Sequence, residues 1–333
     1  MSAHTIDRRE AGTPERGRDT AVPPGRDRGP RRPDGRRPRR VGPRQVTAWA
    51  FLVPVAVYLA VFYAYPLVRN VDLSVRDYTI RSFIDGSAPF IGFDNFARIV
   101  QSPTFGPALA NTLTFTLVSI AFQFTIGMAL AVFFFQRFRL SATLRALFLV
   151  PWLLPLIVSA STWSWMLNSE SGIVNATIRA LGGGQVNWLT SPQWALTSVI
   201  VANIWIGIPF NLVILYSGLQ NIPGDLYEAA SLDGATSWQR FRRITFPLLA
   251  PVSAITILLG LVYTLKVFDI IWIMTRGGPG DASTTFAIWS YQLGFGSTLP
   301  TFGPAAAVGN LLIVMALICG LVYLRVQRKQ ENS

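Results

Sequence analysis

Long apolar runs recur along this sequence after residue 45, and they constrain its fold more than any other feature. A helix of about 20 apolar residues is long enough to cross a hydrocarbon core of about 30 Å. Charged residues make up only 14% of the chain, whereas soluble domains carry about a quarter. We therefore predict an all-α, polytopic membrane protein, a helical bundle with about six transmembrane helices. The predicted spans are 46–67, 108–135, 146–167, 194–218, 248–274 and 304–324.

The first 45 residues differ from the rest in composition. They hold thirteen of the 29 basic residues, all arginine, with many prolines and glycines and few large apolar side chains. Such a segment cannot bury enough surface to offset the entropy lost on ordering, so we predict a disordered tail. Arginine runs can bind nucleic acid or anionic lipid, but no aromatic residues are interleaved here to stack on bases. A solvated cytoplasmic tail that orients the chain, with no nucleic-acid partner, is the preferred interpretation.

Basic residues also predict the orientation of the spans. With the N-terminus in the cytoplasm, residues 136–145, 219–247 and 325–333 are cytoplasmic and carry nine basic residues, against six on the opposite side. The arginines of the tail add to this difference, and the positive-inside rule then places both termini in the cytoplasm. The predicted domains are a tail over 1–45, a transmembrane domain over 46–325 and a C-terminal cytoplasmic tail over 326–333.

Few residues are available for catalysis or for metal binding. The chain has one histidine, His4, and one cysteine, Cys319, so it can form neither an intramolecular disulfide nor a metal site built from His and Cys. The glycine run 182–184 is not followed by Lys and Ser or Thr, so it predicts a turn and not a phosphate loop. We predict that the chain is not an enzyme and binds no cofactor itself.

A polar segment over 219–247 separates two of the apolar runs and is predicted to form a helix, a turn and a second helix. Strong helix formers occupy 225–233, where Asp225 lies in the favourable first turn. Gly234 suits the left-handed conformation that ends a helix, and Thr236 or Ser237 can cap the next one. We expect both helices to lie along the membrane surface, with Pro247 at the start of the next span. By periodicity alone, an amphipathic helix that rests on lipid is an equal alternative.

Within this segment the residues Glu228-Ala229-Ala230, followed by Gly234, Ile244 and Pro247, closely resemble the EAA loop of ABC-importer permeases. The resemblance covers about 46–325 and favours the carbohydrate permeases of the maltose and glycerol-phosphate class. Its other segments are Phe90-Ile91-Gly92-Phe93-Asp94-Asn95-Phe96, Asn203-Ile204-Trp205, Phe268-Asp269-Ile270-Ile271-Trp272 and Thr275-Arg276-Gly277-Gly278-Pro279-Gly280.

The resemblance implies a permease subunit of an ATP-driven importer in the inner membrane of a bacterium. Its partners would be a second permease, an ABC ATPase dimer that binds ATP and Mg, and an extracytoplasmic solute-binding protein. The implied cargo is a carbohydrate, with a polyol or glycerol 3-phosphate as the alternative within the class and a stand-alone secondary transporter outside it. The implied ATPase-docking residues are Glu228, Ala229, Ala230, Asp233, Gly234, Ala235, Phe241, Ile244 and Pro247.

Polar side chains inside apolar runs are costly and are therefore candidates for the substrate path. Lys266 and Asp269 are three residues apart in one predicted span, where they can meet on one helix face. They could line the path, or they could neutralise each other and pack the bundle. The other candidates, each of which could instead serve helix packing, are Asn203, Trp205, Asn211, Tyr216 and Tyr263.

Overall fold

The structure is a computed structural model that describes residues 43–136, 138–296 and 298–331. Its contacts divide the chain into 1–56 and 57–333, and the second unit contains nearly all of the described fold. The predicted disordered tail lies outside the described residues except for its last three, which belong to the first helix.

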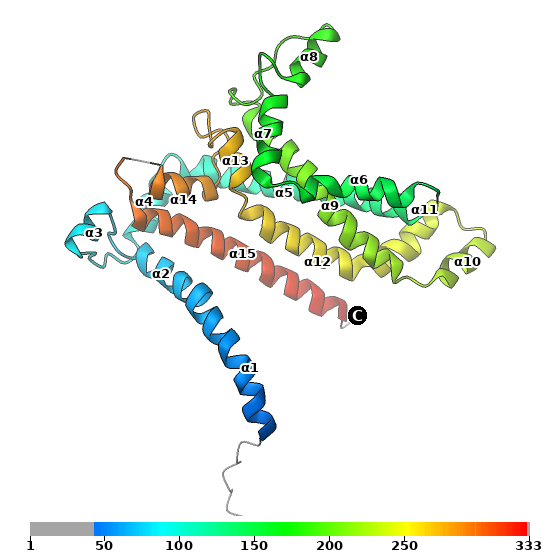
Figure 1. Cartoon of the computed structure of the whole chain (residues 1–333), viewed down its shortest axis with the longest axis horizontal. Helices are drawn as coiled ribbons and strands as arrows, with labels where there is room; N and C mark the ends of the chain where they lie inside the picture. The colour runs from blue at the N-terminus through cyan, green and yellow to red at the C-terminus, as the bar shows by residue number, and fades with distance from the viewer. Residues whose placement is uncertain (1–42, 137, 297, 332–333) are drawn as a thin grey trace, which may run out of the picture. The chain divides into compact units, whose positions relative to one another are not determined.

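The described residues form helices joined by short loops (Figure 1). In chain order they are α1 (Pro43–Leu59), the π-helical turn η1 (Ala60–Ala64), α2 (Tyr65–Ser74), α3 (Ile80–Asp85), α4 (Asp94–Gln101), α5 (Phe105–Phe135), α6 (Ser141–Leu153), α7 (Leu156–Met166), α8 (Ile173–Ala180), α9 (Ala195–Gln220), α10 (Gly224–Leu232), α11 (Ser237–Arg240), the π-helical turn η2 (Phe241–Thr245), α12 (Phe246–Leu265), α13 (Asp269–Met274), α14 (Phe286–Phe295) and α15 (Phe302–Glu331). Only isolated β-bridges, Arg76 with Phe90 and Thr79 with Thr301, occur in this part of the chain. The predicted all-α fold is confirmed.

Five helical segments are long and apolar enough to cross a membrane, and a bent pair of helices can make a sixth. The five are Ala50–Ser74, Phe105–Phe135, Ala195–Gln220, Ser237–Leu265 and Phe302–Arg325. Each overlaps a predicted span. The last helix continues past its apolar part to Glu331, so the described portion of the predicted C-terminal tail is helical.

Helices α5 and α9 lie side by side at the centre of the fold, α12 packs against both, and α15 packs along α12 (Figure 1). Small residues allow the close approach of α5 and α9, as is common between membrane helices. A Cβ atom at Gly127 of α5 would lie 2.5 Å from the Cβ of Asn211 on α9. On the opposing helix, a Cβ at Gly207 would overlap the side-chain amide of Gln123.

The third predicted span, 146–167, is not one straight helix. Helices α6 and α7 meet at an angle of 95° between Leu153 and Leu156. Pro155 explains the break, because its ring excludes the preceding residue from the helical region and Leu154 has an extended ψ of 140°.

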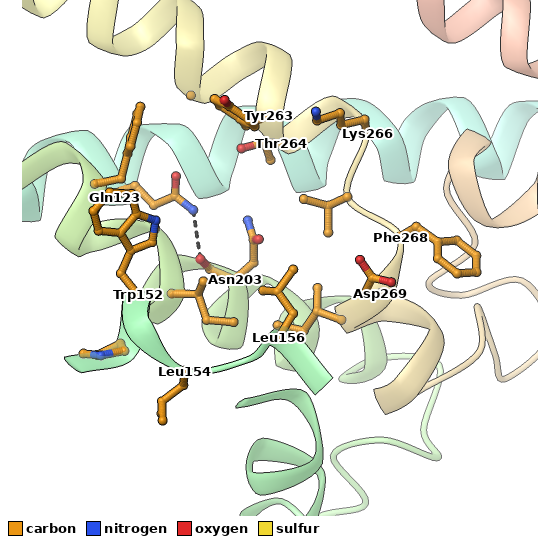
Figure 2. Close-up of a pocket in the computed structure, with 17 residues that line it drawn as sticks. Gln123, Trp152, Leu154, Leu156, Asn203, Tyr263, Thr264, Lys266, Phe268 and Asp269 are labelled. Carbon is orange, nitrogen blue, oxygen red and sulfur yellow. Dashed lines mark hydrogen bonds between the residues drawn. The ribbon is translucent and has the colours of Figure 1, made fainter. Parts of the chain in front are cut away.

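The fifth predicted span, 248–274, is wrong at both ends. Its helix begins at Ser237 and stops at Leu265, and α13 starts only at Asp269 (Figure 2). After the break, Phe268 and Trp272 both pack against Tyr291 of α14, with ring centroids 4.8 and 4.7 Å apart. The apolar run continues through both helices, so hydropathy could not reveal the interruption.

The second arm of the polar segment is not a separate helix. It forms the first turns of the 29-residue helix Ser237–Leu265, and Pro247 lies inside that helix. The π-helical turn η2 ends at Thr245, two residues before this proline. A wider turn leaves room for a ring that would clash with the carbonyl of a regular α-helix, which the sequence prediction did not consider.

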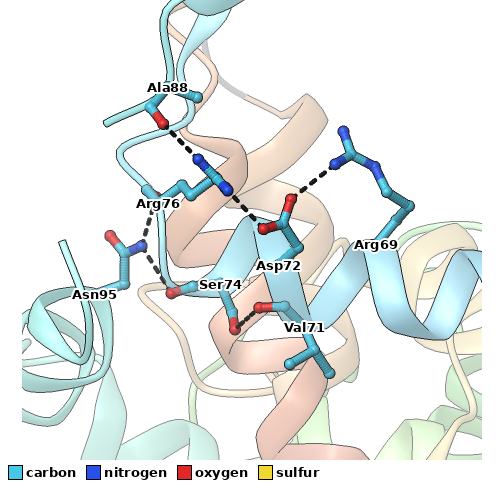
Figure 3. Close-up of polar contacts among 7 residues, drawn as sticks. All are labelled: Arg69, Val71, Asp72, Ser74, Arg76, Ala88 and Asn95. Carbon is cyan, nitrogen blue, oxygen red and sulfur yellow. Dashed lines mark hydrogen bonds and ion pairs between the residues drawn. The ribbon is translucent and has the colours of Figure 1, made fainter. Parts of the chain in front are cut away.

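The loop after α2 is fastened by a buried asparagine (Figure 3). Asn95 is fully buried, and its Nδ2 donates hydrogen bonds of 2.9 Å to the carbonyl oxygens of Ser74 and Arg76. Arg76 also contacts Asp72 at 2.7 Å and donates to the carbonyl of Ala88. This gives a structural reason for asparagine within the segment 90–96.

Candidate functional site

The predicted docking segment begins with α10, which lies at one end of the helices, away from α13 and α14 (Figure 1). Asp225 lies in its first turn as predicted, and Gly234 follows its end with a left-handed φ of +74°. Thr236 then caps the next helix. Its hydroxyl accepts a hydrogen bond from the backbone N–H of Gln239, and the side-chain oxygen of Gln239 accepts one from the backbone N–H of Thr236. The predicted turn and cap are confirmed.

The nine predicted docking residues fall into two groups by burial. Glu228, Ala229, Asp233, Gly234 and Pro247 are exposed, whereas the rest are half-buried: Ala230, Ala235, Phe241 and Ile244. Phe241 and Ile244 pack against a buried core that includes Leu219 and Leu249. The structure thus separates residues that present a surface from residues that hold the segment in place.

A pocket of about 450 Å³ opens among α5, α6, α9 and α12 (Figure 2). Its polar side chains are Gln123, Asn203, Thr264, Lys266 and Asp269. Its aromatic lining residues are Trp152, Phe210, Tyr263 and Phe268. A mostly apolar cavity with a few converging polar groups is the usual form of a small-molecule site.

Four of the seven predicted path residues line this pocket, and three do not. Asn203, Tyr263, Lys266 and Asp269 are in its wall. The other three make contacts elsewhere: Trp205 lies edge-on to Trp163 at 6.0 Å, Asn211 donates to the Gly207 carbonyl of its own helix, and Tyr216 lies 4.2 Å under the Arg145 guanidinium.

Sequence reasoning missed Gln123, Trp152, Phe210 and Phe268. The signal that could have found Gln123 is its stripe on α5, where Thr112, Thr116 and Ser119 precede it at helical spacing and are also buried.

Lys266 and Asp269 do not share a helix face, which corrects the sequence prediction. Lys266 follows the last residue of α12 and Asp269 is the first of α13. Among the described residues the only ion pairs are those that Asp72 makes with Arg69 and Arg76, so the two pocket charges do not neutralise each other directly. The Lys266 ammonium instead lies 4.8 Å from the ring centroid of Tyr263, an attractive cation–π contact.

Asn203 carries a polar group that the protein itself leaves without a partner. The residue is 7% exposed, and its Nδ2 makes no hydrogen bond within the described chain. Its backbone carbonyl, in contrast, accepts a 2.9 Å hydrogen bond from Gln123. An unpaired buried amide costs free energy, and among the residues whose buried side-chain atoms lack a partner in the described chain, Asn203 is the one in the pocket wall.

Both helix breaks border the same pocket. Leu154 and Leu156 flank the break between α6 and α7, and Lys266–Phe268 form the break before α13. Non-helical backbone at membrane depth is tolerated where it lines a cavity, because the freed backbone groups can be hydrated or can bind a ligand. Among the described residues, no group of three or more His, Cys, Asp or Glu could hold a metal.

Comparison with known proteins agrees with this arrangement. Residues 123–332 match the family of binding-protein-dependent transport system inner membrane components. A trehalose/maltose transport system permease of Thermococcus litoralis, MalF, is 36% identical over 285 residues, which cover 85% of this chain and 94% of the relative. A lactose transport system permease of Rhizobium radiobacter, LacF, is 31% identical over 291 residues, which cover 86% of this chain and 95% of the relative.

A solved structure shares the fold. It is a bacterial ABC transporter involved in the import of the acidic polysaccharide alginate, and one of its chains superposes with a TM-score of 0.75 at 27% identity. The match covers 86% of this chain and 96% of the other. The chain belongs to the inner-membrane-component family of binding-protein-dependent transport systems, and it is a multi-pass permease component of an ABC transporter, not an enzyme.

Proposed function

We propose that this chain is one of two permeases of a carbohydrate importer and that the pocket of Figure 2 is its part of the sugar path. The observation that carries the proposal is the unpartnered Asn203 amide in the wall of a pocket bordered by two helix breaks. The names of the relatives support a saccharide, since they include permeases for trehalose/maltose, lactose and sulfoquinovosyl glycerol.

The lining of the pocket suits a sugar. The rings of Trp152, Phe210 and Tyr263 follow one another in edge contacts, with centroids 6.4 and 6.0 Å apart. Aromatic faces can pack against the C–H face of a sugar ring, while Gln123 and Asn203 can bond its hydroxyls from another wall. Trp205, Asn211 and Tyr216 are not part of this proposed path.

The energy source is proposed to be an ATPase dimer that binds ATP and Mg and docks on α10. On this chain, the contact surface for the ATPase would consist of Glu228 and Ala229, which are exposed, together with Ala230, Asp233 and Gly234. Ala235, Phe241, Ile244 and Pro247 would support this surface. The α10 surface would face the cytoplasm of a bacterial cell, and a solute-binding protein would deliver the sugar from the opposite side of the inner membrane. Both termini are proposed to be cytoplasmic on the basis of the positive-inside rule.

A second candidate function is the import of an anionic cargo, such as an acidic saccharide or glycerol 3-phosphate. The observation in its favour is Lys266, whose ammonium lies in the pocket without a carboxylate partner. Asp269 in the same wall opposes it, so a neutral sugar is the first choice.

Co-purification tests the docking. A tagged wild-type chain, extracted from its own membranes in mild detergent, should retain the ATPase and the sister permease, whereas the double variant Glu228→Ala, Gly234→Asp should lose the ATPase. The matched control is Glu170→Ala, Gly184→Asp, which makes the same changes at two exposed positions on either side of α8. A wild-type chain without any ATPase would contradict the proposal and return a self-sufficient transporter to consideration.

Uptake then tests the cargo. Vesicles that carry the complete complex, enclose ATP and have the binding protein outside should accumulate trehalose or maltose and should not accumulate glycerol 3-phosphate. The reverse preference would favour the second candidate.

A further inference from the structure

The backbone between the proposed docking surface and α12 contains two positions at which it can bend. The first is Gly234, an exposed glycine with a left-handed φ whose added Cβ would meet nothing within 4 Å. The second is η2, the π-helical turn Phe241–Thr245, where the N–H of Phe246 bonds to Phe241 five residues earlier. Bends and local changes of register concentrate at such turns. A force on Glu228 would therefore reach α12 poorly along the backbone alone.

Side chains connect the same two elements across both points. The hydroxyls of Tyr227 on α10 and Thr245 at the end of η2 share a hydrogen bond of 3.0 Å. Thr245 is 6% exposed, and the ring of Tyr227 lies 6.1 Å from that of Phe135 on α5. This bond joins α10 directly to the far side of the π-helical turn.

A second set of side-chain hydrogen bonds joins the C-terminal end of α10 to α11. Arg240 donates from Nη1 to Ser231 Oγ at 2.9 Å, and that hydroxyl donates to the carbonyl of Tyr227 at 2.7 Å. Tyr227 and Ser231 are four residues apart and so share one face of α10. Glu228 and Ala229 are exposed, so the helix bonds to its own chain on one face and leaves another free.

The element that receives these bonds also reaches the pocket. Beyond Thr245, α12 is 20 residues long, which at 1.5 Å per residue spans about 30 Å. Tyr263 and Thr264 at its far end line the pocket, and Lys266 follows directly. A displacement at Thr245 is thus carried by a single helix to the wall of the proposed sugar path.

We propose that the Tyr227–Thr245 bond is a coupling latch: it transmits movement of α10 to α12 and so links the docking surface to the pocket. Tyr227 and Thr245 are positioning residues in this scheme, and they contact neither the ATPase nor the sugar. The latch rests on the proposed docking function. Without it, α10 would still bind the ATPase, but its movement would be absorbed at Gly234 and η2.

The test separates binding of the ATPase from transmission of movement. Leu154 lines the pocket, and a Leu154→Cys reporter in a Cys319→Ser background measures pocket accessibility as the rate of maleimide labelling. The complex that the tagged chain forms in its own membranes is labelled with and without a non-hydrolysable ATP analogue. The variant pair is Tyr227→Phe with Thr245→Val, which removes both hydroxyls and preserves the shape of both side chains.

The latch predicts that the variant keeps its ATPase while the nucleotide-dependent change in labelling rate falls about fivefold, the factor expected for the loss of one hydrogen bond. Thr245→Ser keeps the hydroxyl and should restore the response. The control Tyr58→Phe with Thr162→Val removes the same atoms from exposed positions and should respond as the wild type does.

Two results would overturn the latch alone: an unchanged labelling response in the variant, or loss of the ATPase from the variant, which would make the bond a part of docking. A wild-type complex that contains no ATPase would instead overturn the docking proposal, and the latch with it.

Discussion

The side-chain amide of Gln123 donates a 2.9 Å hydrogen bond to the backbone carbonyl of Asn203, and this bond joins α5 to α9 in the wall of the pocket. The side-chain amide of Asn203 points to no partner in the described chain. Within one pair of residues, therefore, one polar group joins two helices and another has no partner in the described chain.

Replacing Asn203 by leucine should leave stability unchanged or raise it, because the substitution removes a buried amide that has no partner. Uptake should fall by about tenfold or more, as expected when a ligand loses a buried hydrogen bond of about 1.5 kcal/mol. Thermal unfolding in detergent and vesicle uptake measure the two effects. A variant that unfolds at a clearly lower temperature would show that Asn203 is a packing residue.

Replacing Gly127 by alanine should destabilise the fold by roughly 1–3 kcal/mol, the usual cost of overpacking. The new methyl group would meet the Cβ and backbone of Asn211 and the backbone N of Leu212, which cannot turn away as a long side chain could. Gly106→Ala is the matched control, since it lies on the same helix and its Cβ meets nothing within 4 Å. Equal unfolding temperatures for both variants would contradict the close contact of α5 and α9.

Replacing Asn95 by alanine should lower the free energy of unfolding by about 2–3 kcal/mol, because two buried carbonyl oxygens lose their donor. Limited proteolysis should then cut between α2 and α4 at a higher rate. Asn168→Ala provides a comparison, because Asn168 accepts hydrogen bonds within an exposed turn. A proteolysis rate that does not change in Asn95→Ala would show that the loop is held by other contacts.

Changing one pocket charge at a time should shift the preferred charge of the cargo in opposite directions. Asp269→Asn removes the carboxylate and should raise competition by an acidic disaccharide for uptake of a neutral one, whereas Lys266→Met should lower it. A shift of about three- to tenfold in each direction corresponds to one screened charge pair at the pocket. Parallel shifts in both variants would mean that neither charge faces the cargo.

The sequence predicted the parts of this fold that depend on local chemistry. Apolar runs located the spans, and glycine and threonine placed the turn and cap at Gly234 and Thr236. It did not predict the break after Leu265, because no proline or glycine marks it and the packing of Phe268 and Trp272 against Tyr291 of α14 is a tertiary contact. The sequence also could not tell which aromatic residues of a span line the pocket. Trp205 and Tyr216 do not line it and instead pack against Trp163 and Arg145.

The contact between Gly127 and Asn211 has a consequence for how a transport path could open. Helices that interlock this tightly cannot slide past each other without a clash between backbones, so a shear motion between α5 and α9 is disfavoured. A motion that preserves this contact turns the two helices as one rigid body, and a change of access would then occur where α6, α7 and α12 meet that body.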